Sequence, residues 1–251
     1  MKNILYIILC ISIVCSNETI GLVMKKKGKV SYTPYSNKKI QNLDISESLF
    51  NQDLIETGKN GFTNFVYLDD GSSIKIHKNS EIYVQGDIYE RKIVKQINIA
   101  TGKLKLDINK QSSSNFKVIT PTSVASVKGT RFWVDVNGKK GDVFHGLSGS
   151  VQIKNSITGN IVELSKNTTA ISLPDGTLEI KEIDNMQLRV LEKLEESVGE
   201  PTDDMPSIND NGSYNNQGSF NQSSNSNINE IVIRLKNSNS EQKSLIIKYS
   251  D

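Results

Sequence analysis

The residues that could support hydrolytic chemistry lie close together near position 146. Gly146-Leu147-Ser148-Gly149-Ser150 is similar to the Gly-x-Ser-x-Gly turn that exposes a nucleophilic serine, and Asp142 and His145 precede it. The fifth position is serine, and the predicted surroundings are strand, turn and strand, whereas the nucleophile turn joins a strand to a helix. Successive residues of a strand point to opposite faces, so this spacing does not assemble an acid, a base and a nucleophile. We predict no catalytic residues and no enzymatic activity.

The sequence predicts neither a metal site nor a cofactor. Two histidines and two cysteines leave little material for a zinc site. His77 stands at the polar end of a predicted strand, and we expect it to be exposed in a turn. Asp69-Asp70-Gly71 and Asp175-Gly176 are similar to fragments of calcium loops, but the further acidic ligands are missing. These acidic residues are therefore predicted to form turns.

Composition narrows the class of protein further. The chain has 251 residues, with 30 Lys and Arg against 28 Asp and Glu, which gives a net charge of +2. This balance lacks the positive excess that drives sequence-independent binding to nucleic acid, so no nucleic-acid partner is predicted. No apolar run reaches the roughly 18 residues that a membrane-spanning helix needs.

The first 21 residues have the pattern of an export signal. A short basic start is followed by a largely apolar run from Ile4 to Val14, and cleavage after Ser16 or after Gly21 fits the pattern. Both cysteines lie in this segment, so the mature chain would have no disulfide. An alternative is that Cys15 carries the lipid of a lipoprotein, which would be the only membrane attachment. We expect a periplasmic or secreted protein, with the lysines that follow (Lys25, Lys26, Lys27 and Lys29) as a solvated flank.

Residues 28–182 have the pattern of an all-β domain. Apolar residues recur with a period of two, for example in Phe65-Val66-Tyr67-Leu68 and Phe132-Trp133-Val134-Asp135-Val136, where Trp133 is predicted to be a core residue. Glycine after Asp, Asn or Thr separates the strands, because glycine adopts the positive φ of tight turns. We expect Gly129 to occupy such a turn.

The C-terminal part differs in kind. Residues 183–198 have helical spacing of Leu and Val and end at Gly199-Glu200-Pro201. Residues 199–229 are rich in Asn, Ser, Gly and Gln, which predicts a disordered linker and a flexible tail. Residues 230–251 hold two apolar runs around a polar turn, the pattern of a hairpin that closes an edge of the main domain or recruits a partner strand.

Several motifs of the β domain resemble the FecR domain family. The resemblance covers Asp53 to Ile153, and its motifs are Asp53-Leu54-Ile55-Glu56-Thr57-Gly58, Leu68-Asp69-Asp70-Gly71-Ser72, Lys78-Asn79-Ser80-Glu81-Ile82, Gly102-Lys103-Leu104-Lys105-Leu106, Phe116-Lys117-Val118-Ile119-Thr120-Pro121, Gly129-Thr130-Arg131-Phe132 and Gly149-Ser150-Val151. The resemblance implies a periplasmic sensor module that reads an outer-membrane transporter and controls a sigma factor. The chain departs from that plan, because we find no cytoplasmic regulator segment before its hydrophobic stretch. His145-Gly146 also replaces apolar residues, which predicts a bulge or bend.

These observations predict short strands stacked in a solenoid-like body, with a β-sandwich as the alternative, and one C-terminal helix. The solenoid-like choice rests partly on the family resemblance. The expected function is that of a non-catalytic exported module that binds an envelope protein or an envelope polymer. The alternative is a structural component of the cell envelope.

Overall fold

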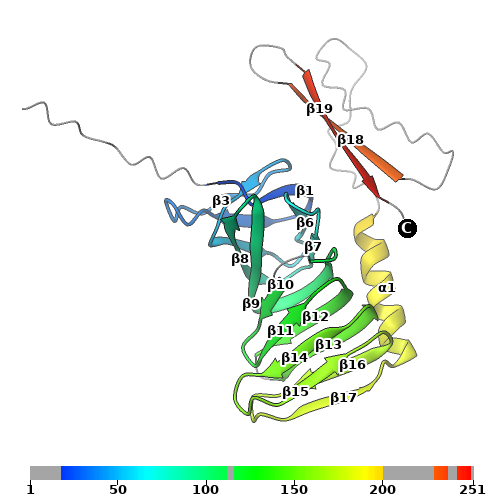
Figure 1. Cartoon of the computed structure of the whole chain (residues 1–251). Helices are drawn as coiled ribbons and strands as arrows, with labels where there is room; N and C mark the ends of the chain where they lie inside the picture. The colour runs from blue at the N-terminus through cyan, green and yellow to red at the C-terminus, as the bar shows by residue number, and fades with distance from the viewer. Residues whose placement is uncertain (1–17, 112–115, 139, 200–228, 237–241, 250–251) are drawn as a thin grey trace, which may run out of the picture. The chain divides into compact units, whose positions relative to one another are not determined.

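The computed structural model describes residues 18–111, 116–138, 140–199, 229–236 and 242–249 (Figure 1). Within these ranges the chain forms a main body of strands β1 to β17, one helix, and a hairpin that is a separate compact unit. Cys15, most of the predicted signal segment, and residues 200–228 of the predicted linker lie outside the described residues.

The seventeen strands of the main body are hydrogen-bonded into one open sheet that is folded into two layers, sheet A and sheet B. In spatial order, sheet A consists of β4 (Ser48–Leu49), β1 (Gly21–Lys27), β6 (Phe62–Tyr67), β7 (Ser73–Ile76), β9 (Lys92–Asp107), β12 (Arg131–Asn137), β13 (Gly141–Ser148), β16 (Thr168–Ser172) and β17 (Leu178–Glu182). Sheet B consists of β3 (Gln41–Asn42), β2 (Val30–Thr33), β5 (Asp53–Thr57), β8 (Glu81–Tyr89), β9, β10 (Phe116–Ile119), β11 (Ser123–Val127), β14 (Val151–Asn155) and β15 (Ile161–Leu164).

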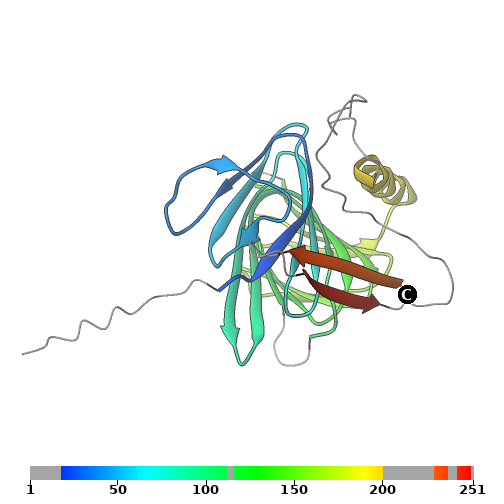
Figure 2. The same cartoon turned by 90° about the horizontal axis from the view of Figure 1, so that it is seen from above.

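The chain advances along the stack by alternating between the two sheets. After β9 it adds β10 and β11 to sheet B, β12 and β13 to sheet A, β14 and β15 to sheet B, and β16 and β17 to sheet A. Figure 1 shows the later strands as successive rungs, and Figure 2 shows the early strands in front of them. The predicted all-β, solenoid-like stack is confirmed. Its two layers also pack face to face, which is the feature of a sandwich.

Strand β9 belongs to both sheets and joins them. Its first part, up to Thr101, pairs with β8, and its last part, from Gly102, pairs with β12. Gly102 stands at the crossing with a φ of +114°, and a Cβ atom there would lie 2.1 Å from Oγ of Ser80. Glycine is required here, because any other residue would be strained at this positive φ and its Cβ atom would collide with Ser80.

The hydrophobic core lies between the two sheets. Phe132 and Val134 of sheet A and Val118 and Val127 of sheet B belong to one buried cluster, as the alternation of apolar residues predicts. Trp133 points from β12 to the opposite, outer side of sheet A, yet only 2% of its surface is exposed. The prediction that Trp133 is buried is confirmed, although it lies outside the main core.

The start of the body differs from our prediction. Lys25, Lys26 and Lys27 are not a solvated flank, because they belong to β1, which pairs with β6 inside sheet A. The body therefore begins at Gly21 and not at residue 28. Ile20 is buried, and its N–H donates to the carbonyl of Leu49 at 2.9 Å. Of the two predicted cleavage positions, only the one after Ser16 keeps this first strand intact.

The bulge predicted at His145-Gly146 occurs in the middle of sheet A. Phe132 pairs with Gly146 and Arg131 with Ser148, so Leu147 is the extra residue of β13. The bulge is not at an edge, because β13 pairs with both β12 and β16. Gly129, expected in a turn, has a φ of +152°.

Helix α1 (Asn185–Gly199) follows β17 and lies beside the stack in both views (Figures 1 and 2). Asp184 caps it, because its Oδ1 accepts a hydrogen bond from the N–H of Met186 at 3.0 Å. In the second unit, β18 (Asn229–Lys236) and β19 (Gln242–Tyr249) pair antiparallel. None of the helices in the described ranges is both long enough and apolar enough to span a bilayer.

Candidate functional site

The residues considered for hydrolytic chemistry do not form a catalytic group. Asp142 points into the body, where its Oδ2 accepts a hydrogen bond from the backbone N–H of Thr122 at 3.0 Å. His145 points to the outer side of sheet A, where Nδ1 lies 2.9 Å from Oγ1 of Thr169. Ser148 accepts a hydrogen bond from Nε of Arg131 at 3.2 Å. The three side chains thus have separate hydrogen-bond partners.

His77 was expected in an exposed turn, and this expectation is wrong. Its side chain is 2% exposed and lies between the rings of Phe62, at 5.2 Å, and Trp133, at 4.9 Å between centroids. Burial disfavours the charged imidazolium and lowers the pKa of His77 from 6.5 to about 4, the same direction and value as for His145. His77 is two residues after Lys75 and lies on the same face of the sheet, and the sequence does not show what covers that face.

The acidic turn after β6 surrounds a buried lysine. Nζ of Lys95 is 2.7 Å from Oδ2 of Asp69 and 2.8 Å from Oδ2 of Asp70, and the side chain of Lys95 is only 2% exposed. Desolvation opposes ionisation of Asp70, but hydrogen bonds from Lys95, Ser72 and Gln111 outweigh it and lower the pKa of Asp70. These two carboxylates bind a cation of the chain itself. Within the described ranges, His, Cys, Asp and Glu side chains form no group of three that could hold a metal ion.

A row of polar side chains crosses the outer face of sheet B. Each residue is paired in register with the next one on the neighbouring strand, and the row consists of Gln85, Gln96, Lys117, Ser126, Gln152 and Glu163. We call it the polar row. Its members are half-buried or exposed. Since neighbouring strands are about 4.8 Å apart, the polar row is about 24 Å long.

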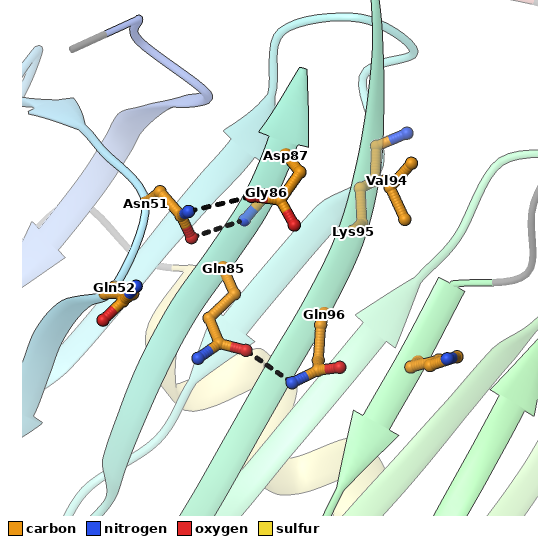
Figure 3. A pocket seen from close by; sticks show the side chains of 9 residues that line it. Asn51, Gln52, Gln85, Gly86, Asp87, Val94, Lys95 and Gln96 are labelled. Carbon is orange, nitrogen blue, oxygen red and sulfur yellow. Dashed lines mark hydrogen bonds between the residues drawn. The ribbon is translucent and has the colours of Figure 1, made fainter. Parts of the chain in front are cut away.

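A hollow of about 300 Å³ lies at the β8 end of the polar row (Figure 3). Amide side chains from β8, β9 and the loop before β5 line it, and Lys117 of β10 borders it. Asn51 accepts a hydrogen bond from the N–H of Gly86 at 3.2 Å and donates one to Asp87 at 3.1 Å. Nε2 of Gln96 donates to Oε1 of Gln85 and, at 2.9 Å, to Oδ1 of Asn98.

The chemistry of this surface is that of recognition. Carboxamides offer both donors and acceptors without charge, and the polar row adds one cation, Lys117, and one anion, Glu163. A polar chain lying across the strands could exchange hydrogen bonds at each 4.8 Å step, because the row repeats once per strand. The sequence does not show that these residues lie in one row. The row forms only when six strands pair in register, from β8 with Gln85 to β15 with Glu163.

Residues 53–152 match the family model described as FecR protein. The resemblance seen in the motifs of this segment is thereby confirmed, over nearly the same residues.

The chain is also similar to two crystal structures of a provisionally assigned anti-sigma factor from Parabacteroides distasonis ATCC 8503. The first alignment has 15% identity and a TM-score of 0.46, and covers 54% of this chain and 62% of the other. The second has 15% identity and a TM-score of 0.45, and covers 55% and 63%. The chain thus aligns with less than two thirds of that protein. None of the curated proteins matches this chain.

Proposed function

We propose that the main body is a non-catalytic binding module, in which the polar row holds an extended polar chain of another envelope protein or of an envelope polymer. The observation that carries this proposal is the alignment of six polar side chains on six adjacent strands, ending in the amide-lined hollow. An extended peptide or a glycan strand presents donors and acceptors along its whole length, as the polar row does across the sheet.

The placement of the buried polar groups supports a non-catalytic role. Asp142 and Lys95 are bonded to other parts of the body, and His77 and His145 are held neutral at pH 7 by burial. A general acid or base needs a pKa near the working pH and access to a substrate. These buried groups therefore support the fold, and the exposed polar row supports binding.

Export is part of the proposal. The apolar segment before Asn17 has the pattern of a signal sequence, and Cys15 is the residue that a lipid would modify. The FecR resemblance implies a sensing role, in which occupancy of the module is reported to another protein of the envelope. Mass spectrometry of the mature N-terminus distinguishes cleavage after Ser16 from lipidation at Cys15.

Site-specific photo-crosslinking in intact cells tests the binding surface. A benzophenone amino acid is introduced in place of Gln96 or Lys117, and in place of the exposed Lys166, outside the polar row, as the control. We expect a discrete adduct from the first two positions and not from the third. Digestion of the adduct with protease or with a glycan hydrolase identifies the ligand class. Identical adduct patterns at all three positions, or none at any, would contradict the proposal.

A structural role is the second candidate, and one observation favours it. Among the described strands, β15 and β17 are the last of sheets B and A, and each carries an exposed isoleucine, Ile161 at 54% and Ile180 at 45%. Unpaired strand edges with apolar side chains promote stacking of one copy on another. Concentration-dependent assembly in solution would support this role.

A further inference from the structure

Helix α1 lies on the outer side of sheet A and presents Leu188, Leu191 and Leu194 among its buried or half-buried apolar residues. Leu191 is its only buried residue among those whose side chains are described, while Met186 and Val190 are exposed. Glu195 lies one turn after Leu191, so both face the sheet. A helix of 15 residues is marginal by itself in water and depends on such contacts.

Charged groups also attach α1 to the sheet. Oε1 of Glu195 is 2.5 Å from Nζ of Lys75, and Oε2 is 2.5 Å from Nζ of Lys105. The two lysines are paired in register on β7 and β9, and Trp133 is the next residue of the same row. The ion pairs lower the pKa of Glu195 although desolvation opposes this. One carboxylate thus faces two ammonium groups, and the sheet keeps an excess of positive charge.

Two lysines of strand β1 attach the C-terminal end of α1, close to Glu195. Nζ of Lys27 donates to the carbonyl of Ser197 at 3.2 Å, and Nζ of Lys25 donates to the carbonyl of Val198. The last turn of α1 has no basic residue of its own, so these strand lysines supply the positive charge that favours a helix C-terminus. Lys25 and Lys27 of β1 therefore contact the last turn of α1.

Helix α1 does not complement this face completely. Nε2 of His77 is buried without a hydrogen-bond partner, next to Trp133. A buried polar atom without a partner is unfavourable, so a ligand that reached it would gain a bond that α1 leaves unmade. The covered face, defined as Lys75, His77, Lys105 and Trp133 together with Lys25 and Lys27 of β1, has a cationic and aromatic character that suits an acidic ligand.

We propose that the covered face is a second docking surface, for an acidic amphipathic helix of another protein, and that α1 occupies it until that helix displaces it. The geometry of α1 defines the partner: a leucine and a glutamate four residues apart, followed within one turn by a helix end whose carbonyls meet β1. The polar row lies on the other sheet, so this proposal goes beyond the proposed function and does not depend on it.

Trp133 reports the release of α1, because it is the only tryptophan of the chain. In Glu195→Gln the two ion pairs are lost, and we expect the population with α1 detached to rise about tenfold. Fluorescence emission should shift to longer wavelength, and acrylamide quenching should increase. Glu196→Gln is the matched control, since Glu196 is exposed and no ion pair is seen for it within the described ranges. Equal quenching in the wild type and both variants would overturn the proposal.

A measurement without substitution checks the same point. High salt screens partly exposed ion pairs, so sodium chloride should increase acrylamide quenching of Trp133 in the wild type and have less effect on Glu195→Gln. Far-UV circular dichroism establishes that the β body stays folded in each sample. Quenching that is independent of salt in the folded wild type would count against a charge-held α1.

Docking itself is tested with a peptide of residues 185–199 added to the full-length Glu195→Gln protein. We expect the peptide to reverse the fluorescence shift, and a peptide carrying Glu196→Gln to do the same. A peptide carrying Glu195→Gln should bind at least about tenfold more weakly. If no peptide reverses the shift, or if all three act equally, the covered face is not a docking surface for an acidic helix.

Discussion

Both histidines of the chain are buried on the outer side of sheet A, which makes the stability of the fold dependent on pH. Their pKa is lowered from 6.5 to about 4 in the folded state, chiefly by burial. Between these values the unfolded chain binds protons that the folded chain does not bind. The contribution of the two neutral histidines to the free energy of unfolding is therefore complete above pH 7, and it is lost as the pH decreases from 6.5 towards 4.

We predict that the free energy of unfolding at pH 5 is lower than at pH 7.5 by about 2 kcal/mol for each histidine, since each pH unit below the unfolded pKa costs about 1.4 kcal/mol. Urea unfolding at several pH values measures this. Asp70 and Glu195 have lowered pKa values and titrate at lower pH, so the window from 5 to 6.5 belongs to the histidines. A His77→Gln, His145→Gln variant should lose most of the slope, and an unchanged slope would contradict the assignment.

Lys95 is the buried cation on which the acidic turn depends. In Lys95→Met, Asp69 and Asp70 keep their charges without a counter-ion, so we expect the free energy of unfolding to fall by about 3 kcal/mol. Lys92→Met, at an exposed position of the same strand, is the control and should be nearly neutral. Adding Asp69→Asn and Asp70→Asn to Lys95→Met should restore part of the loss. If Lys95→Met lowered the free energy of unfolding by less than about 0.5 kcal/mol, the ion pairs of Lys95 with Asp69 and Asp70 would not stabilise the fold.

At the scale of elements, the crossing of β9 from one sheet to the other depends on Gly102. In Gly102→Ala the new methyl group collides with Ser80, and the alanine must also adopt a positive φ. We therefore expect the free energy of unfolding to fall by about 3 kcal/mol or more. Gly138→Ala is the control, because a Cβ atom there has no neighbour within 4 Å. Thermal melts of the two variants make the comparison, and equal melting temperatures would exclude a special role for Gly102.

The individual strands could be predicted from the sequence because alternation and glycine turns are local signals. Phe132 and Val134 are in the core, and Trp133 is on the other face, as a period of two requires. The partners of each strand could not be predicted in the same way. The polar row joins residues far apart in the sequence, and the sequence does not show the place of β1 in sheet A, because Lys25 and Lys27 find their partners in α1, about 170 residues later.

The same limit applies to helix α1 and to His77. Helical spacing of Leu and Val predicted a helix at 183–198, close to the observed Asn185–Gly199. The sequence does not indicate which sheet the helix covers, because the partners of Glu195 are lysines about 90 and 120 residues earlier in the chain. The burial of His77 beside Trp133 depends on packing that no local pattern encodes.

At the scale of the whole molecule, a stack of strands has ends, and the ends determine whether copies associate. Ile161 and Ile180 are exposed on the last strands of the two sheets. If stacking occurs there, an Ile161→Lys, Ile180→Lys variant should remain monomeric at concentrations where the wild type associates. Ile45→Lys, exposed in the loop before β4, is the control. Analytical ultracentrifugation measures this, and identical sedimentation of all three proteins would exclude end-to-end stacking.

The most direct test of the account is binding to isolated cell envelopes by the full-length protein and by a variant in which Gln96, Lys117 and Gln152 are replaced by alanine. These side chains are half-buried or exposed on sheet B, so the variant should keep the melting temperature of the wild type. We predict that it sediments with the envelopes at least about tenfold less well, because a ligand on the polar row loses three sets of hydrogen bonds. Equal sedimentation of the two folded proteins would contradict a binding role for the polar row.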